Sequence, residues 1–134
     1  MQFGPINELI LHGVFDRGVP NQERIVLKTQ GHLNLAAFGL LVTAKQYGAT
    51  FPLPDHFFWF GETLLDAGTW VYVYTGPGLT RMTQTMQTNE PAYVLHWNRD
   101  NVMFHQEALF PALIRIDAAA IDKTEFLPLL PNHS

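Results

Sequence analysis

Short apolar runs alternate with turn residues along almost the whole chain, and this pattern limits what the chain can fold into. Each run is about four to eight residues long, the usual length of a strand. Gly, Pro, Asn or Asp follows the runs at intervals of roughly ten residues. No long stretch shows the period of an amphipathic helix. We therefore predict an all-β domain, an antiparallel sandwich or barrel of about seven to nine short strands.

The expected strands differ in how strongly their residues alternate. Residues 23–29 (ERIVLKT) and 70–75 (WVYVYT) have the two-residue period of a half-buried strand. The other expected strands are 8–15, 33–35, 38–45, 56–60, 92–97, 102–105 and 112–117. Residues 79–90 are polar and rich in Thr and Gln, and we predict a long loop there. We expect residues 123–134 to form a loosely packed tail of a single domain, 1–134.

Composition supports a folded domain and excludes several kinds of site. The chain has 134 residues, of which 47% are hydrophobic and 15% are charged, so it is too apolar for a disordered chain. It contains no cysteine, which excludes a disulfide, a thiolate nucleophile and a cysteine-ligated metal. Its single serine is Ser134, which argues against a serine hydrolase. We expect no cofactor.

Charge and hydropathy bear on partners and location. The formal net charge is −4 and the 8 basic residues are scattered, so a nucleic-acid partner is disfavoured. A DNA-binding surface would have to use Arg81, Arg99 and the loop 79–90. Residues 1–5 lack the pattern of a secretory signal, and no apolar stretch approaches the ~20 residues of a membrane-spanning helix. We therefore expect a cytoplasmic protein with no membrane span.

The order of motifs from Glu23 to Asp117 resembles the lamin-tail domain. The matching segments are Glu23-Arg24-Ile25-Val26-Leu27, Leu33-Asn34-Leu35-Ala36-Ala37-Phe38-Gly39-Leu40, Phe57-Phe58-Trp59-Phe60, Leu65-Asp66-Ala67-Gly68-Thr69-Trp70-Val71-Tyr72-Val73, Thr75-Gly76-Pro77-Gly78, His96-Trp97-Asn98-Arg99-Asp100-Asn101 and Ala112-Leu113-Ile114-Arg115-Ile116-Asp117. This resemblance implies an immunoglobulin-like β-sandwich. It also implies binding of protein, DNA or membrane-associated partners, and it supplies no catalytic residues.

Two groups of polar residues suggest other functions, a metal site and the active site of a small hydrolase. His56, His96 and His105 lie on or beside expected strands, and their convergence would give a three-histidine metal site. Within residues 96–101, His96 would act as a general base and Arg99 as an electrostatic stabiliser of a small hydrolase, with the carboxylate of Asp100 nearby. We favour the simpler interpretations, polar strand positions and a β-turn, and predict neither a catalytic nor a metal site.

Aromatic residues give the strongest functional indication. Alternate residues of a strand face opposite sides, so Trp70, Tyr72 and Tyr74 share one face of residues 70–75. Together with Trp59 they predict a binding surface, unless another part of the chain covers them. We predict a non-catalytic binding or assembly module that engages a protein partner or forms a homo-oligomer. The alternatives are the small metal-dependent or acid-base hydrolase and the nucleic-acid-binding module.

Overall fold

A computed structural model of the protein describes residues 4–46 and 49–120. The tail expected at 123–134 lies outside this range. The described residues form ten strands and one short 3-10 turn. Their bounds are β1 Leu9–Phe15, β2 Arg24–Thr29, β3 Leu33–Asn34, η1 Leu35–Ala37, β4 Phe38–Gln46, β5 Ala49–Trp59, β6 Leu64–Leu65, β7 Trp70–Tyr74, β8 Arg81–Gln84, β9 Pro91–His96 and β10 Leu109–Arg115.

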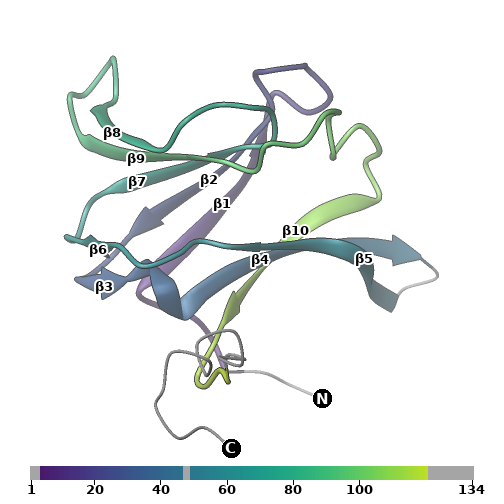
Figure 1. Ribbon diagram of the computed structural model, residues 1–134, viewed down its shortest axis with the longest axis horizontal. Coiled ribbons are helices and arrows are strands. Elements are labelled where there is room, and N and C mark those ends of the chain that lie inside the picture. The colour runs from purple at the N-terminus through teal and green to yellow at the C-terminus, as the bar shows by residue number, and fades with distance from the viewer. Residues whose placement is uncertain (1–3, 47–48, 121–134) are drawn as a thin grey trace, which may run out of the picture.

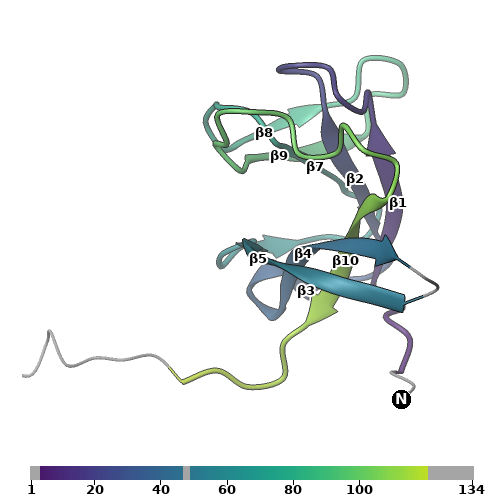
Figure 2. The same ribbon diagram turned by 90° about the vertical axis from the view of Figure 1, so that its right-hand side faces the viewer.

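The strands form two larger sheets and one small sheet. The order in the five-stranded sheet is β1-β2-β7-β9-β8, and the order in the three-stranded sheet is β10-β4-β5. The short β3 and β6 pair with each other. Figures 1 and 2 show the two larger sheets as facing layers, with β10 passing close to β1 at one side. The all-β class expected from the sequence is confirmed.

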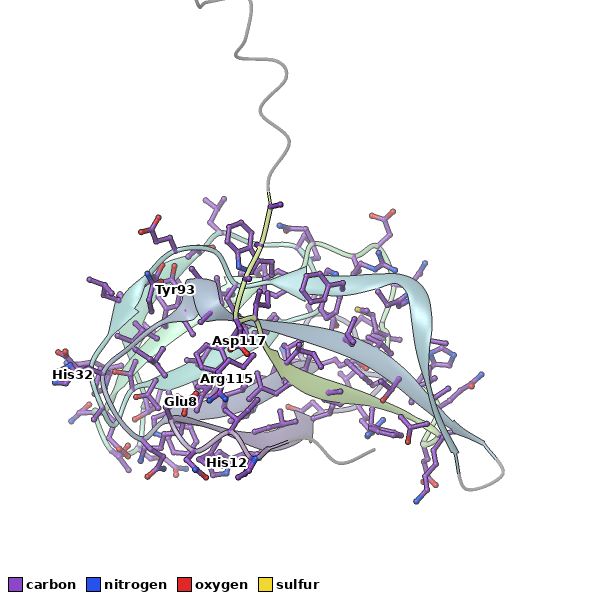
Figure 3. The ribbon with its side chains drawn as sticks, turned by 90° about the horizontal axis from the view of Figure 1, so that it is seen from below. Glu8, His12, His32, Tyr93, Arg115 and Asp117 are labelled. Atoms are coloured by element: carbon purple, nitrogen blue, oxygen red, sulfur yellow. The ribbon has the colours of Figure 1, made fainter. Side chains whose placement is uncertain are left out.

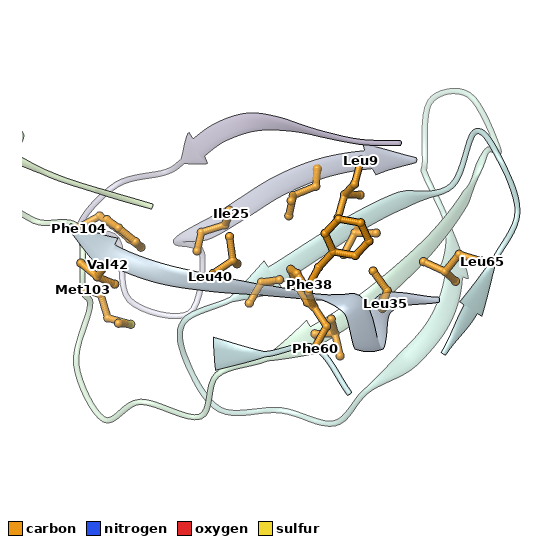
Figure 4. Packing of buried hydrophobic residues seen from close by; sticks show 14 residues of the cluster. Leu9, Ile25, Leu35, Phe38, Leu40, Val42, Phe60, Leu65, Met103 and Phe104 are labelled. Atoms are coloured by element: carbon orange, nitrogen blue, oxygen red, sulfur yellow. The ribbon is translucent and has the colours of Figure 1, made fainter. Parts of the chain in front are cut away.

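Alternate residues of the facing strands build the hydrophobic core (Figure 4). The five-stranded sheet contributes Ile25, Leu27, Val71 and Val73, each 0% exposed. The other layer contributes inward residues of β4 and its surroundings, which include Leu35, Phe38, Leu40, Val42 and Phe60. Burial of each such side chain contributes roughly 1.5–3 kcal/mol relative to its exposure to water. This shared core holds the two sheets together.

One strand pair departs from the antiparallel arrangement that we expected. β7 and β9 run parallel, with Trp70 opposite Ala92 and Tyr74 opposite His96. Parallel neighbours need a crossover connection. Residues 75–90 supply it, and within them β8 pairs antiparallel with the outer edge of β9. Part of the segment expected as a loop is therefore a strand. All four β8 residues are exposed, so no apolar alternation marks it in the sequence.

Residues 102–105, which we expected to form a strand, belong instead to a loop that is tied down by a buried carboxylate. Glu23 is 1% exposed. Its Oε1 accepts hydrogen bonds from the Met103 amide at 2.7 Å and the Thr75 hydroxyl at 2.8 Å. Its Oε2 accepts from the Gly18 amide at 2.8 Å and the Phe104 amide at 3.1 Å. These four bonds compensate for the lost hydration of the carboxylate and join three loops at one end of the molecule.

Candidate binding groove

The aromatic row of β7 lies on the outer face of the five-stranded sheet, away from the shared core. Trp70, Tyr72 and Tyr74 are half-buried there, whereas Val71 and Val73 between them point inward and are fully buried. The three rings form one wall of a groove of about 590 Å³. Residues of β8 and of the turn that follows it, including Arg81 and Thr83, line the other side. The alternation predicted from the sequence is confirmed for this strand.

A continuous row of side chains in contact crosses all five strands at one end of the groove. The Arg24 guanidinium lies 5.7 Å from the centre of the Phe15 ring and 5.9 Å from that of Tyr74. Tyr74 in turn stacks on His96, with 5.3 Å between ring centroids and 18° between planes. The Arg81 Nη1 and His96 Nε2 atoms are 3.2 Å apart. Cation–π contacts of this kind stabilise by about 0.5–1 kcal/mol each at exposed sites.

His96 is held tightly within this row. Its Nδ1 lies 3.3 Å from the Gly76 carbonyl oxygen, so the ring can donate there and accept from Arg81 at Nε2. Burial lowers the pKa of His96, and the nearby charge of Arg81 lowers it further against the opposing bond to Gly76. A Cβ added at Gly78 would overlap the imidazole ring. His96 is therefore clamped between the Tyr74 ring and the backbone of Gly78.

A second stacked group closes the opposite end of the groove. The Lys28 ammonium lies 4.6 Å from the centre of the Trp70 ring and 3.0 Å from a Glu90 carboxylate oxygen. The His12 ring packs against the same indole at a centroid distance of 5.3 Å. Hydrogen bonds from Lys28, Thr88 and Trp70 hold the pKa of Glu90 below its ordinary value. Glu90 therefore stays ionised at neutral pH and neutralises Lys28.

Between these two ends, the strands around Tyr72 are apolar. Tyr72 lies between Val26 on β2 and Val94 on β9 in the strand register. Both valines are buried, at 3% and 2% exposure, yet they are separate from the core cluster between the sheets. Burial raises the pKa of the Tyr72 phenol. The outer face of this sheet thus has a small hydrophobic layer of its own.

The fourth predicted surface residue, Trp59, lies on the other sheet. It is on β5, where it is 52% exposed and its Nε1 donates to the Ala36 carbonyl at 2.8 Å. Phe57, two residues earlier, is 47% exposed and lies where a Cβ on Gly39 would otherwise sit. The predicted aromatic surface is therefore divided between two faces of the molecule.

Where β10 passes β1, Arg115 at the end of β10 lies between two carboxylates (Figure 3). Its Nη1 is 3.0 Å from Glu8 Oε1, and its Nε is 3.8 Å from Asp117 Oδ1. The Arg115 guanidinium holds the pKa of Glu8 below its ordinary value. The cation that ends β10 is thus already engaged within the molecule.

The residues of the two chemical alternatives are divided in a similar way. His56, Arg99, Asp100 and His105 line one hollow of about 440 Å³, and Arg99 Nη2 lies 3.2 Å from His56 Nε2. His96 makes its contacts elsewhere, with Gly76, Arg81 and Tyr74. Within residues 4–46 and 49–120, no three His, Cys, Asp or Glu side chains are arranged to hold a metal ion.

The stacked cations of the groove were not among the predicted site residues. An argument from cross-strand pairs could have found them. If β2 is placed antiparallel to β7, Arg24 lies opposite Tyr74 and Lys28 lies opposite Trp70. The position of β8 had no comparable signal. Its exposed residues Arg81–Gln84 show no pattern that specifies β9 as their neighbour.

Comparison with known proteins identified no relative of this chain. No protein-family model, no curated protein and no solved structure matches the chain. In the part of the chain that the structure describes, no helix has the length and apolar character to cross a bilayer.

Proposed function

We propose that the protein is a non-catalytic binding module and that the groove over β7, β9 and β8 receives an extended segment of a partner protein, which can be a second copy of the chain. An immunoglobulin-like sandwich of the lamin-tail type and a cytoplasmic location remain parts of this proposal. The facing sheets are compatible with such a sandwich, and six of the seven strand pairs in the described residues are antiparallel.

The observation that carries the proposal is the braced aromatic wall of the groove. Trp70 and Tyr74 are each held by a cation and by a second ring, so their positions are set before a ligand arrives. Such preorganisation lowers the entropy lost on binding. Tyr and Trp are also the residues that most often dominate the energy of protein interfaces. Tyr72, at the centre of the groove, is the residue expected to contribute most.

The two alternatives have weaker support. An acid-base hydrolase would need His96 beside Arg99, but these side chains contact different partners, Arg81 and His56. A nucleic-acid surface would need clustered cations, yet Arg81 and Arg99 line different hollows. In addition, the stacked side chains already cover ring faces that bases would use.

The proposal is tested by capture of partners on the full-length protein, followed by affinity measurement with the purified partner. We expect Tyr72→Ala to weaken binding at least about tenfold, because central interface tyrosines commonly contribute this much. Phe57→Ala removes an exposed ring from the other sheet and is the matched control, which should bind like wild type. Sedimentation of the full chain reports whether the partner is a second copy.

Two results would contradict the proposal. One is a Tyr72→Ala protein with an unchanged melting temperature that binds its partner as tightly as wild type. The other is a loss of binding in Phe57→Ala alone, which would place the interface on β5 instead.

A further inference from the structure

The three cations beside the groove differ in whether an acid neutralises them. Arg24 pairs with Asp16 at 2.6 Å, and Lys28 pairs with Glu90 at 3.0 Å. Arg81 has no carboxylate partner among the residues that the structure describes. It lines the groove and is exposed. The end of the groove near Tyr74 therefore has one uncompensated positive charge.

The contacts of Arg81 leave part of its guanidinium available. Nη1 approaches the Leu79 carbonyl at 3.4 Å and His96 Nε2 at 3.2 Å. The Nε and Nη2 groups form no hydrogen bond within the described residues, and together they make the forked edge that binds two oxygens of a carboxylate. His96 is clamped by Tyr74 and Gly78, so it gives Arg81 a fixed point of attachment.

Several features favour a carboxylate on a polypeptide over the phosphates of a nucleic acid. Trp70 and Tyr72 stack on each other, and Tyr74 stacks on His96, so ring faces are already in use. At the opposite end of the groove Lys28 is already paired with Glu90, so a chain that bears a phosphate at every step would meet no uncompensated cation there. A single carboxylate needs only the one uncompensated cation, Arg81, and an apolar neighbour in the same segment would cover Tyr72.

We propose that Arg81 is a carboxylate-binding subsite of the groove, and that the partner segment places one carboxylate there. The carboxylate can be an Asp or Glu side chain or the C-terminal group of the partner. This inference rests on the proposed binding function, because it specifies the chemistry of the segment that enters the same groove.

The test uses random heptapeptides displayed on phage and panned on the immobilised full-length protein. One library presents the peptides with a free C-terminus and the other within a loop, which separates the two sources of carboxylate. The targets are wild type, Arg81→Gln, Tyr72→Ala and Lys45→Gln. Lys45 is exposed on β4, so Lys45→Gln makes the same change of charge outside the groove. Binding of a dT12 oligonucleotide is measured in parallel at two salt concentrations.

We expect wild type and Lys45→Gln to enrich peptides with a carboxylate at a constant position. A synthetic peptide of the enriched sequence should bind about tenfold more tightly than its Glu-to-Gln or C-terminally amidated counterpart, because the bond to Arg81 is charge-assisted. Arg81→Gln should bind both forms alike.

The outcomes separate the two proposals. Peptides that need Tyr72 but bind equally well without the carboxylate would overturn the subsite and leave the groove function intact. If no peptide is enriched, or if enrichment is indifferent to Tyr72→Ala, the groove function fails and the subsite fails with it. Salt-sensitive binding of dT12 that is lost in Arg81→Gln would overturn the polypeptide assignment in favour of nucleic acid.

Discussion

The outer faces of the two sheets both carry aromatic residues, but they hold them differently. On the five-stranded sheet, Tyr74 is stacked between Arg24 and His96. On the three-stranded sheet, Phe57 and Trp59 remain about half exposed, at 47% and 52%. The first face surrounds its rings with long polar side chains from neighbouring strands, whereas the register partners of Phe57 and Trp59 on β4 are Leu41 and Gly39. An aromatic strand thus has a different role depending on what the adjacent strands place beside it.

The largest difference between the two faces is expected when one ring is removed from each. Tyr74→Ala should destabilise the protein by roughly 2–3 kcal/mol, because it removes a half-buried ring and two stacking contacts. Phe57→Ala should cost less than about 1 kcal/mol. Chemical denaturation of both variants measures the two values. Equal losses of stability would show that the stacked row does not brace its sheet.

The clamp on His96 gives a somewhat smaller effect. Gly78→Ala places a methyl group where the imidazole lies, so the ring must leave its position between Tyr74 and the backbone. We expect a loss of roughly 1–2 kcal/mol and altered NMR signals of the His96 ring. Gly31→Ala is the matched control, because a Cβ there meets nothing within 4 Å. Unperturbed His96 signals in Gly78→Ala would argue against the clamp.

The other face should respond more mildly to the same kind of change. A Cβ at Gly39 would overlap mainly the edge of the Phe57 ring, which is half exposed, and would also lie 3.0 Å from the Phe58 carbonyl oxygen of the paired strand. Gly39→Ala should therefore cost about 1 kcal/mol or less in the free energy of unfolding. A loss as large as that of Gly78→Ala would mean that Phe57 is held as firmly as His96.

The smallest effect concerns the ion pair at the Trp70 end of the groove. The pKa of Glu90 is lowered in the folded protein, so its contribution to stability is present above the ordinary value of 4.5 and is lost as the pH falls through the lowered value. Melting temperatures between pH 6 and pH 3 should fall slightly less for Glu90→Gln than for wild type. Glu62→Gln, at an exposed position, should follow wild type.

The alternating segments were the predictable part of the molecule. The period-two patterns of residues 23–29 and 70–75 predicted strands, and the structure places β2 and β7 there as neighbours. Alternation identifies faces within a strand but not the partners of that strand. The parallel pairing of β7 with β9 and the division of Trp59 from Trp70 both depend on strand order, which arises from long-range packing.

Polar contacts were the least predictable part. Arg24 and Lys28 look like ordinary solvated positions in the sequence, and their role appears only when β7 lies beside them. Glu23 is more extreme, since a charged residue at the start of a strand is usually exposed. Its partners at Thr75, Met103 and Phe104 are 52, 80 and 81 residues away, and no local pattern encodes such separations.

Those separations also bear on the order of events during folding. A contact across 80 residues carries a high entropic cost of loop closure until the intervening strands have paired. We therefore expect the Glu23 carboxylate to exchange water for backbone amides late, after the sheets have met. Bonds absent from the transition state govern how fast a protein unfolds more than how fast it folds. By joining the loops around residues 18, 75 and 103, this one buried side chain is expected to slow the unfolding of the native state.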